Sequence, residues 1–249
     1  METLALVAAL AIVLELIDSS LGMMYGTILS PLLISLGFAP ELVVPSILIS
    51  QAIGGGIATI RHHNYKSANF KGWTSDTKIV AAIVLPGVLA CFAGAFVATS
   101  IPSWALKTYI GLVAITMGVL CLRPYSYKFA WGKIYGIGIL AGFNKALSGG
   151  GFGPVTSTGK ILGGVSPKLS IATTTYAEVP ICLLSFLFWV ILRGGIEIAF
   201  PLALCVGALI GGIIGPWITY NINTGKLRGI IAILAIISGI WCIAKAFIS

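Results

Sequence analysis

Charged residues are scarce in this sequence, and acidic residues are the scarcest of them. Charged residues make up 9% of the 249 residues, with 7 Asp and Glu in all, whereas soluble domains carry roughly 25%. Hydrophobic residues make up 58%, and the mean hydropathy is +1.05. The apolar runs exceed the ~18 residues that mark a spanning helix. The composition excludes a soluble domain and predicts an all-α polytopic integral membrane protein, with residues 1–249 forming a single transmembrane domain.

Enzymatic and metal-binding patterns are also lacking. The two histidines, His62 and His63, are expected in a loop, so no span supplies the base that an intramembrane serine hydrolase needs. The five cysteines lie in apolar stretches without metal or redox spacing and are expected to pack. Residues 153–161 resemble a P-loop only loosely, because five residues separate the glycines and no Ser or Thr follows Lys160. We therefore expect no enzyme, no cofactor and no metal site.

The start of the chain lacks the positive charge of a signal peptide, because it reads Met1-Glu2. Residues 3–17 are therefore expected to remain as a membrane span. The net charge of +8 could suggest a nucleic-acid partner, but the basic residues are scattered over the loops between spans. That pattern sets orientation in a bilayer. We expect a multi-pass protein of the cytoplasmic (inner) membrane that binds no nucleic acid.

Hydropathy and helix breakers divide the chain into eight apolar units. The first and fifth are too long for one crossing, since about 34 residues make roughly 50 Å of helix against a hydrocarbon core of ~30 Å. Both contain a glycine-rich break, so each is predicted to be a broken or re-entrant helix pair. The units are 3–36, 41–60, 78–99, 104–122, 133–163, 169–192, 197–220 and 226–247.

The two halves of the chain match each other in order and spacing. A shift of 127 relates residues in the first parts of the halves, and a shift of 121 relates later ones. An internal duplication is predicted, with repeat 1 at 1–122 and repeat 2 at 133–249. The matches include Gly22 with Gly149, Tyr25 with Phe152, Gly26 with Gly153, Pro40 with Pro167, Gly94 with Gly215, and Cys121 with Cys242.

Loop charge indicates how the halves are related. The loops 61–77 and 123–133 are the most basic, which places them in the cytoplasm. If the unit 133–163 returns to the side from which it enters, most other basic residues join them there, including Lys160, Lys168, Lys226 and Arg228. Each half then has an odd number of crossings, and two inverted-topology repeats of four hydropathy units are predicted.

Small residues recur at every fourth position in the seventh unit, at Ala203, Gly207, Gly211 and Gly215. Such a ridge lets helix backbones approach closely. A helix–helix seam is the expected role, and the same ridge could also support a homodimer.

Lys145 is the most informative polar residue, because a lysine at bilayer depth costs about 2.5 to 3.5 kcal/mol on insertion scales. Its counterpart in the first half is Asp18. The two could form a structural pair across the repeat axis. Alternatively, Lys145, beside Asn144, faces a cavity and attracts an anion.

Glycine and serine surround both breaks. Free N–H groups at the start of a half-helix carry partial positive charge and bind anions, and serine hydroxyls can donate further hydrogen bonds. A simple hinge is the alternative. The predicted cradle for a small anion consists of Ser148, Gly149, Gly150 and Gly151 in one break and of Ser19, Ser20 and Gly22 in the other.

Glu178 lies in the middle of a predicted span, and its counterpart is Gln51. An intramembrane carboxylate there could carry a proton, or it could be a protonated group bonded between helices. Glu15, one turn before Asp18, could serve equally, so the proton-coupling residue stays open at this point.

These breaks carry a resemblance to a known family. The duplicated plan, the segments 21–26 and 147–153, and the paired segments 37–40 and 164–167 resemble the TauE/SafE sulfite exporter family over nearly the whole chain. The resemblance implies an inner-membrane permease for sulfur-containing anions such as sulfite, sulfonates or thiosulfate. Methionines replace glycines in the first break, which departs from the pattern.

The sequence thus predicts a secondary transporter for a small anion. Its transport could be coupled to protons. A passive anion channel would use the same lysine and amides. A structural membrane subunit would use Lys145 only as half of a buried ion pair.

Overall fold

The computed structural model is a bundle of helices, and no strand occurs in the part of the chain that it describes. The structure describes residues 2–122, 130–162, 165–195, 197–221 and 225–248. The helices are α1 (Glu2–Leu21), α2 (Tyr25–Ser35), α3 (Pro40–Asn64), α4 (Ser75–Ser100), α5 (Ser103–Leu122), α6 (Trp131–Ser148), the π-helix η1 (Pro154–Thr158), α7 (Gly159–Leu162), α8 (Pro167–Arg193), α9 (Ala199–Asn221) and α10 (Gly225–Ile248).

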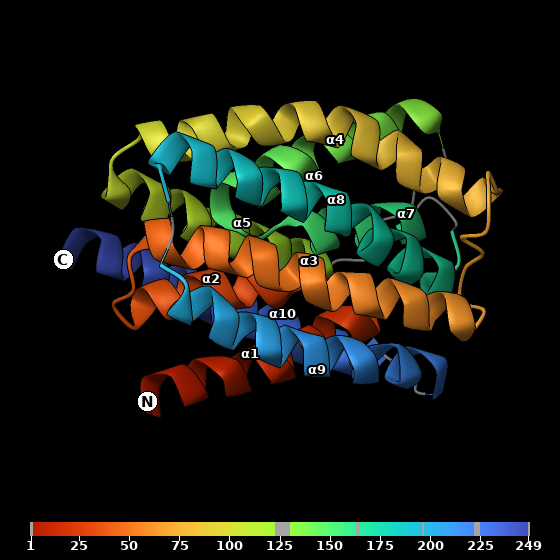
Figure 1. Ribbon diagram of the computed structural model, residues 1–249, viewed down its shortest axis with the longest axis horizontal. Coiled ribbons are helices and arrows are strands. Elements are labelled where there is room, and N and C mark those ends of the chain that lie inside the picture. The colour runs from red at the N-terminus through yellow and green to blue at the C-terminus, as the bar shows by residue number, and fades with distance from the viewer. Residues whose placement is uncertain (1, 123–129, 163–164, 196, 222–224, 249) are drawn as a thin grey trace.

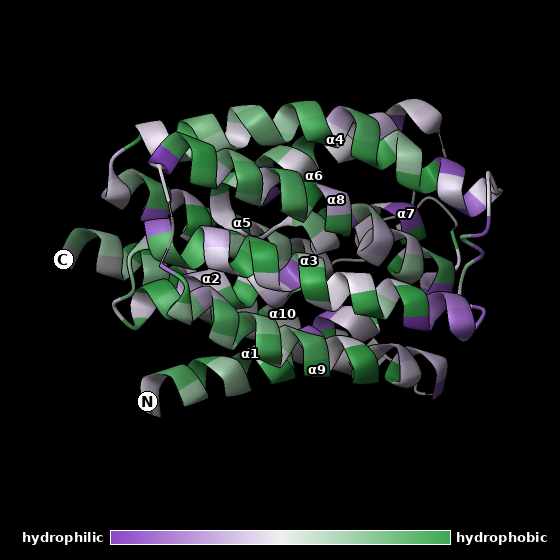
Figure 2. Cartoon of the chain, in the orientation of Figure 1, coloured by the Kyte–Doolittle hydropathy of each residue, from purple (hydrophilic) through white to green (hydrophobic). Residues whose placement is uncertain are grey.

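Five of the described helices are long and apolar enough to cross a membrane, namely α1, α3, α4, α8 and α9. Their exposed faces are apolar: Leu85, Leu89, Phe92 and Phe96 of α4 lie three or four residues apart, and each is more than half exposed. Figure 2 shows hydrophobic residues along the outside of the bundle. Apolar surface on this scale suits lipid contact. The predicted polytopic helical membrane class is confirmed.

Both overlong units consist of more than one helix. The unit 3–36 contains α1 and α2, and the unit 133–163 contains α6, η1 and α7. Glycine interrupts each helix because it adopts the left-handed backbone that ends a helix. In Figure 1 the N-terminus and the connection from α2 to α3 lie at the same end of the bundle.

The two ends of the bundle differ in charge. We call the end with both chain termini the terminal end; there Arg193 Nη2 lies 3.2 Å from Glu41 Oε1. The other, the basic end, carries the 65–74 connection with Lys66 and Lys71, and Lys168 at the start of α8. The residues 123–129 of the predicted basic loop lie outside the described residues, as do the side chains of Lys226 and Arg228.

The first helix of each half packs against the other half. An added Cβ at Gly207 of α9 would lie 2.6 Å from Ala11 Cβ of α1, and one at Gly94 of α4 would lie 2.5 Å from Phe143 O of α6. These are the close approaches that small residues allow. The predicted glycine ridge is therefore a seam within the chain, which leaves it unavailable for the homodimer that it could have supported.

Candidate functional site

Two glycines in left-handed conformation end the first helix of each half. Gly22 has φ 68° and Gly149 has φ 73°. The Gly22 N–H donates to Asp18 O at 2.5 Å, and the Gly149 N–H donates to Lys145 O at 2.9 Å. The two charged residues thus occupy the same place relative to each break. They lie in the last turn before the backbone leaves the helix.

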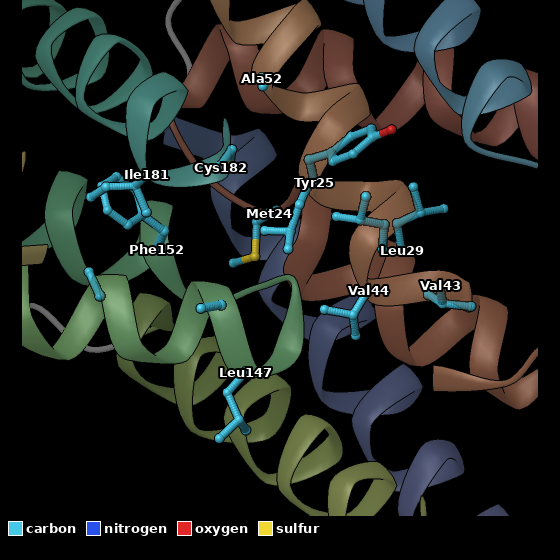
Figure 3. Close-up of a cluster of buried hydrophobic side chains, with 14 of the residues drawn as sticks. Met24, Tyr25, Leu29, Val43, Val44, Ala52, Leu147, Phe152, Ile181 and Cys182 are labelled. Atoms are coloured by element: carbon cyan, nitrogen blue, oxygen red, sulfur yellow. The ribbon is translucent and has the colours of Figure 1, made fainter. Parts of the chain in front are cut away.

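The second half of each break also repeats the same backbone conformation. Met24 has φ 101°, and Gly151, 127 positions later, has φ 78°. A non-glycine residue in this region costs of order 1–3 kcal/mol. Packing offsets the strain: Figure 3 shows Met24 and Tyr25 of one break and Phe152 of the other in one buried cluster with Cys182. The methionine that departs from the glycine pattern therefore keeps the glycine geometry.

A buried chain of polar contacts connects the two breaks. Lys145 Nζ lies 2.8 Å from Glu178 Oε1 and also donates to Gln51 Oε1. Gln51 Nε2 donates to Asp18 Oδ2 at 3.1 Å, and Tyr25 N donates to Asp18 Oδ1 at 2.8 Å. All five residues are at most 4% exposed. The structure therefore brings together four of the predicted site residues from α1, α3, α6 and α8.

The direct pair between Asp18 and Lys145, one of the two sequence-based alternatives, is not what the structure shows. Glu178 is the carboxylate partner of Lys145, and Gln51 stands between Lys145 and Asp18. Asp18 instead accepts the first N–H of α2, whose preceding residue supplies no side-chain cap. A carboxylate at a helix N-terminus is favourable, so Asp18 already has a structural role.

The two candidate proton carriers differ in their surroundings. Glu178 Oε1 lies 2.8 Å from Lys145 Nζ. Glu15 Oε1 accepts a hydrogen bond from Ser19 Oγ at 2.8 Å, while its buried Oε2 has no hydrogen-bond partner among the described residues. An added Cβ at Gly54 would lie 2.9 Å from Glu15 Oε1, so glycine leaves the space for this carboxyl group.

The glycine run donates its N–H groups within the protein. Gly150 N donates to Ser148 Oγ at 3.1 Å, and Gly151 N donates to Thr27 Oγ1 at 2.9 Å. The Ser148 hydroxyl in turn donates to Asn144 O at 2.7 Å. In this conformation the predicted cradle is closed by contacts with α2 and α6. An anion would have to displace these bonds.

The other predicted contact residues are also engaged. Ser20 Oγ donates to Leu16 O at 2.5 Å, and Asn144 Oδ1 accepts from the Tyr109 hydroxyl. The carbonyl of Ser19 lies 3.0 Å from His62 Nε2. These contacts hold the ends of α1 and α6 in place around the network of Lys145, Glu178 and Asp18.

His62 and His63 were wrongly expected in a loop, because helix α3 continues to Asn64 and contains both. His62 is completely buried, with Nε2 against the carbonyl of Ser19. A carbonyl oxygen in the last turn of α1 lacks a partner within its helix, so this contact caps α1. The missed signal is the spacing of Gln51, Ala58 and His62, which places all three on one helix face.

Lys160 was predicted to be one of several basic residues facing the cytoplasm. Figure 1 shows its helix, α7, on the side of the basic end, and the Lys160 side chain is fully buried. Its Nζ donates to Ser170 O at 3.0 Å and to Thr173 Oγ1 at 2.7 Å. The sequence signal for a buried lysine was the hydroxyl-rich segment before Lys160, together with Thr173 on the following helix.

Comparisons with known proteins place these features in a family context. The family described as "Sulfite exporter TauE/SafE" matches residues 6–242. The chain is 27% identical over 246 residues to a protein of Bacillus subtilis (strain 168) described as "Probable membrane transporter protein YtnM", with 93% of this chain and 79% of that protein covered. No solved structure matches.

Proposed function

The chain belongs to the sulfite exporter TauE/SafE family and is a membrane transporter, and we propose that it carries a small sulfur-containing anion such as sulfite, a sulfonate or thiosulfate. The observation that carries the proposal is the buried pair of Lys145 and Glu178. A lysine inside a membrane protein is costly and typically marks a substrate or ion pathway. A substrate anion could replace Glu178 as the partner of this lysine, because both carry negative charge.

Charge balance suggests how binding and protonation are linked. Lys145 and Glu178 together are neutral, and both are almost fully buried. An anion that bound Lys145 beside an ionised Glu178 would leave an uncompensated negative charge in a medium where such charges are costly. If Glu178 takes a proton as the anion replaces it, the charge of Lys145 stays balanced and the net charge of the site does not change. The transporter would then move an anion and a proton together.

Two inverted-topology repeats would serve this mechanism. The matching left-handed residues of the two breaks support a duplication. The reciprocal packing of α1 on α9 and of α6 on α4 also supports it. In Figure 1 α1 runs away from the terminal end and α6 runs toward it. With the basic end in the cytoplasm, Lys145 would lie between two related halves that can rock against each other.

Uptake into proteoliposomes tests the function. Radiolabelled sulfite, thiosulfate and a small sulfonate are offered with and without an imposed pH gradient. Uphill accumulation driven by the gradient is the expected result. Flux without counterflow or proton dependence would indicate a passive channel. No flux of any of the three would overturn the substrate assignment.

Replacing Glu178 with glutamine is expected to uncouple the proton from the anion. The neutral amide resembles protonated Glu178, so Lys145 stays available and anion exchange continues, while uphill accumulation driven by a pH gradient is lost. Glu15→Gln is the matched control, because Glu15 has no lysine partner among the described side chains. If Glu15→Gln loses accumulation and Glu178→Gln keeps it, the proton carrier is Glu15.

A further inference from the structure

Lys160 is a second buried cation, away from the pair of Lys145 and Glu178. Its side chain is fully buried and donates to the carbonyl of Ser170 and to the hydroxyl of Thr173. No carboxylate lies within ion-pairing distance of Lys160 in the described ranges. An ammonium group has three donors. In the protonated form of Lys160, the two neutral acceptors leave the charge and one donor unmatched by the described residues.

A purely structural role explains this lysine poorly. A link between α7 and α8 needs a hydrogen-bond donor, which a neutral side chain also supplies. A buried charge without an opposite charge is expensive, and natural proteins keep such groups in membranes chiefly along substrate or ion pathways. In its protonated form, Lys160 has no balancing carboxylate among the described residues, so a bound anion would complete the site.

The surroundings of Lys160 are rich in hydroxyl groups. Ser157 Oγ lies 2.9 Å from Thr174 Oγ1 and 2.8 Å from Gly22 O, so this cluster reaches the break of the first half. Ser157 belongs to the π-helix η1, which comes directly before α7. Single π-helical turns occur frequently at functional sites. Hydroxyl groups and one ammonium group together form a chemically suitable site for an oxyanion.

A polar cavity of about 640 Å³ lies next to this cluster at the basic end. Its lining includes Lys66, Lys71 and one carboxylate, Asp76, together with Ser166 and Leu169 from the start of α8. The first turn of α8 separates it from Lys160: Ser166 O accepts from Ser170 N at 2.8 Å, and Leu169 O accepts from Thr173 Oγ1 at 2.7 Å. Ser170 and Thr173, which accept from Lys160, are thus one turn away from two residues that line the cavity.

We infer that Lys160 is a second anion-binding residue, which receives a small oxyanion from the basic cavity and passes it to Lys145. The inference rests on the proposed function, because it takes the same anion as the substrate. Lysines in the cavity raise the local anion concentration. Successive sites of moderate strength let an ion move on instead of being trapped.

Charge-keeping and charge-removing substitutions test the inference. Lys160→Gln keeps a donor for Ser170 O and Thr173 Oγ1 but removes the charge, and Lys160→Arg keeps the charge. For sulfite offered at the basic end, Lys160→Gln is expected to raise the half-saturating concentration about tenfold, equivalent to about 1.4 kcal/mol. Lys160→Arg and the control Lys168→Gln, at the same end, are expected to stay near the wild-type value. Equal saturation in Lys160→Gln and wild type would overturn the inference.

Equilibrium binding separates this inference from the transport proposal. Detergent-purified Lys145→Met protein is expected to keep one site for radiolabelled sulfite, and addition of Lys160→Gln is expected to remove it. Absence of binding to folded Lys145→Met protein would overturn the Lys160 site. Sulfite binding that depends on Lys160 would support this site. If wild-type protein in liposomes then showed no sulfite flux, the proposed transport of sulfite would be overturned.

Discussion

Replacing Lys145 with methionine is expected to abolish anion transport, with a loss of at least about 100-fold in the initial rate of uptake. Truncating one partner of a buried, hydrogen-bonded charge pair costs about 2–5 kcal/mol, and here the lost group is also the proposed ligand of the substrate. The change leaves Glu178 and Gln51 without their shared partner. Radiolabelled sulfite uptake into proteoliposomes measures the effect.

Two further variants separate binding from stability. Lys145→Met with Glu178→Gln removes both charges, so it is expected to fold well and still fail to transport. Lys145→Glu with Glu178→Lys restores the pair with its charges exchanged. A structural subunit would regain its role in this swap, whereas a transporter would regain stability alone. Recovered transport in the swap would contradict the assignment of Lys145 as the anion ligand.

Substituting valine for Gly26 is expected to prevent stable folding, at a cost of about 3 kcal/mol or more. Overpacking a tight contact costs about 1–3 kcal/mol, and here a Cβ would overlap the carbonyl of Gly149, a backbone atom that cannot rotate away. Thermal unfolding in detergent, monitored by size-exclusion chromatography, measures the loss of stability.

Gly136→Val provides the matched control, because a Cβ at Gly136 of α6 would meet no atom within 4 Å. The helix-propensity cost of valine applies to both positions. The difference in unfolding temperature between the two variants therefore reports the contact of Gly26 with Gly149. If both variants unfold at the same temperature, the two breaks are not in backbone contact.

Much of the helical architecture could be predicted because lipid imposes a strict length and polarity on each span. The predicted units 41–60 and 78–99 differ from α3 and α4 by at most four residues at either end. Both breaks could be located because glycine adopts the backbone that they require. Met24 shows the limit of that argument, since its conformation is imposed by packing and is not favoured by its side chain.

The partners within the site could not be predicted from the sequence. The equivalence of Asp18 and Lys145 suggested that they meet, but α2 needs a cap at its first N–H, and Asp18 provides it. Pairing of Lys145 with Glu178 depends on how α6 packs against α8, which local patterns do not specify. His62 and Lys160 were missed for a related reason, because sequence hydropathy places basic residues at helix ends without indicating which ones the neighbouring helices cover.

The reciprocal packing of α1 on α9 and of α6 on α4 has a consequence for biosynthesis. When α1 leaves the ribosome, its partner has not yet been made, and most of the chain must be translated before α9 enters the bilayer. Until then the glycine ridge of α9, against which α1 packs, is missing. Glu15 and Asp18 of α1 face lipid or the insertion machinery. Insertion and helix association must therefore be separate stages. We expect the nascent chain to need a partner for the polar residues of α1 in the membrane until α9 has been synthesised.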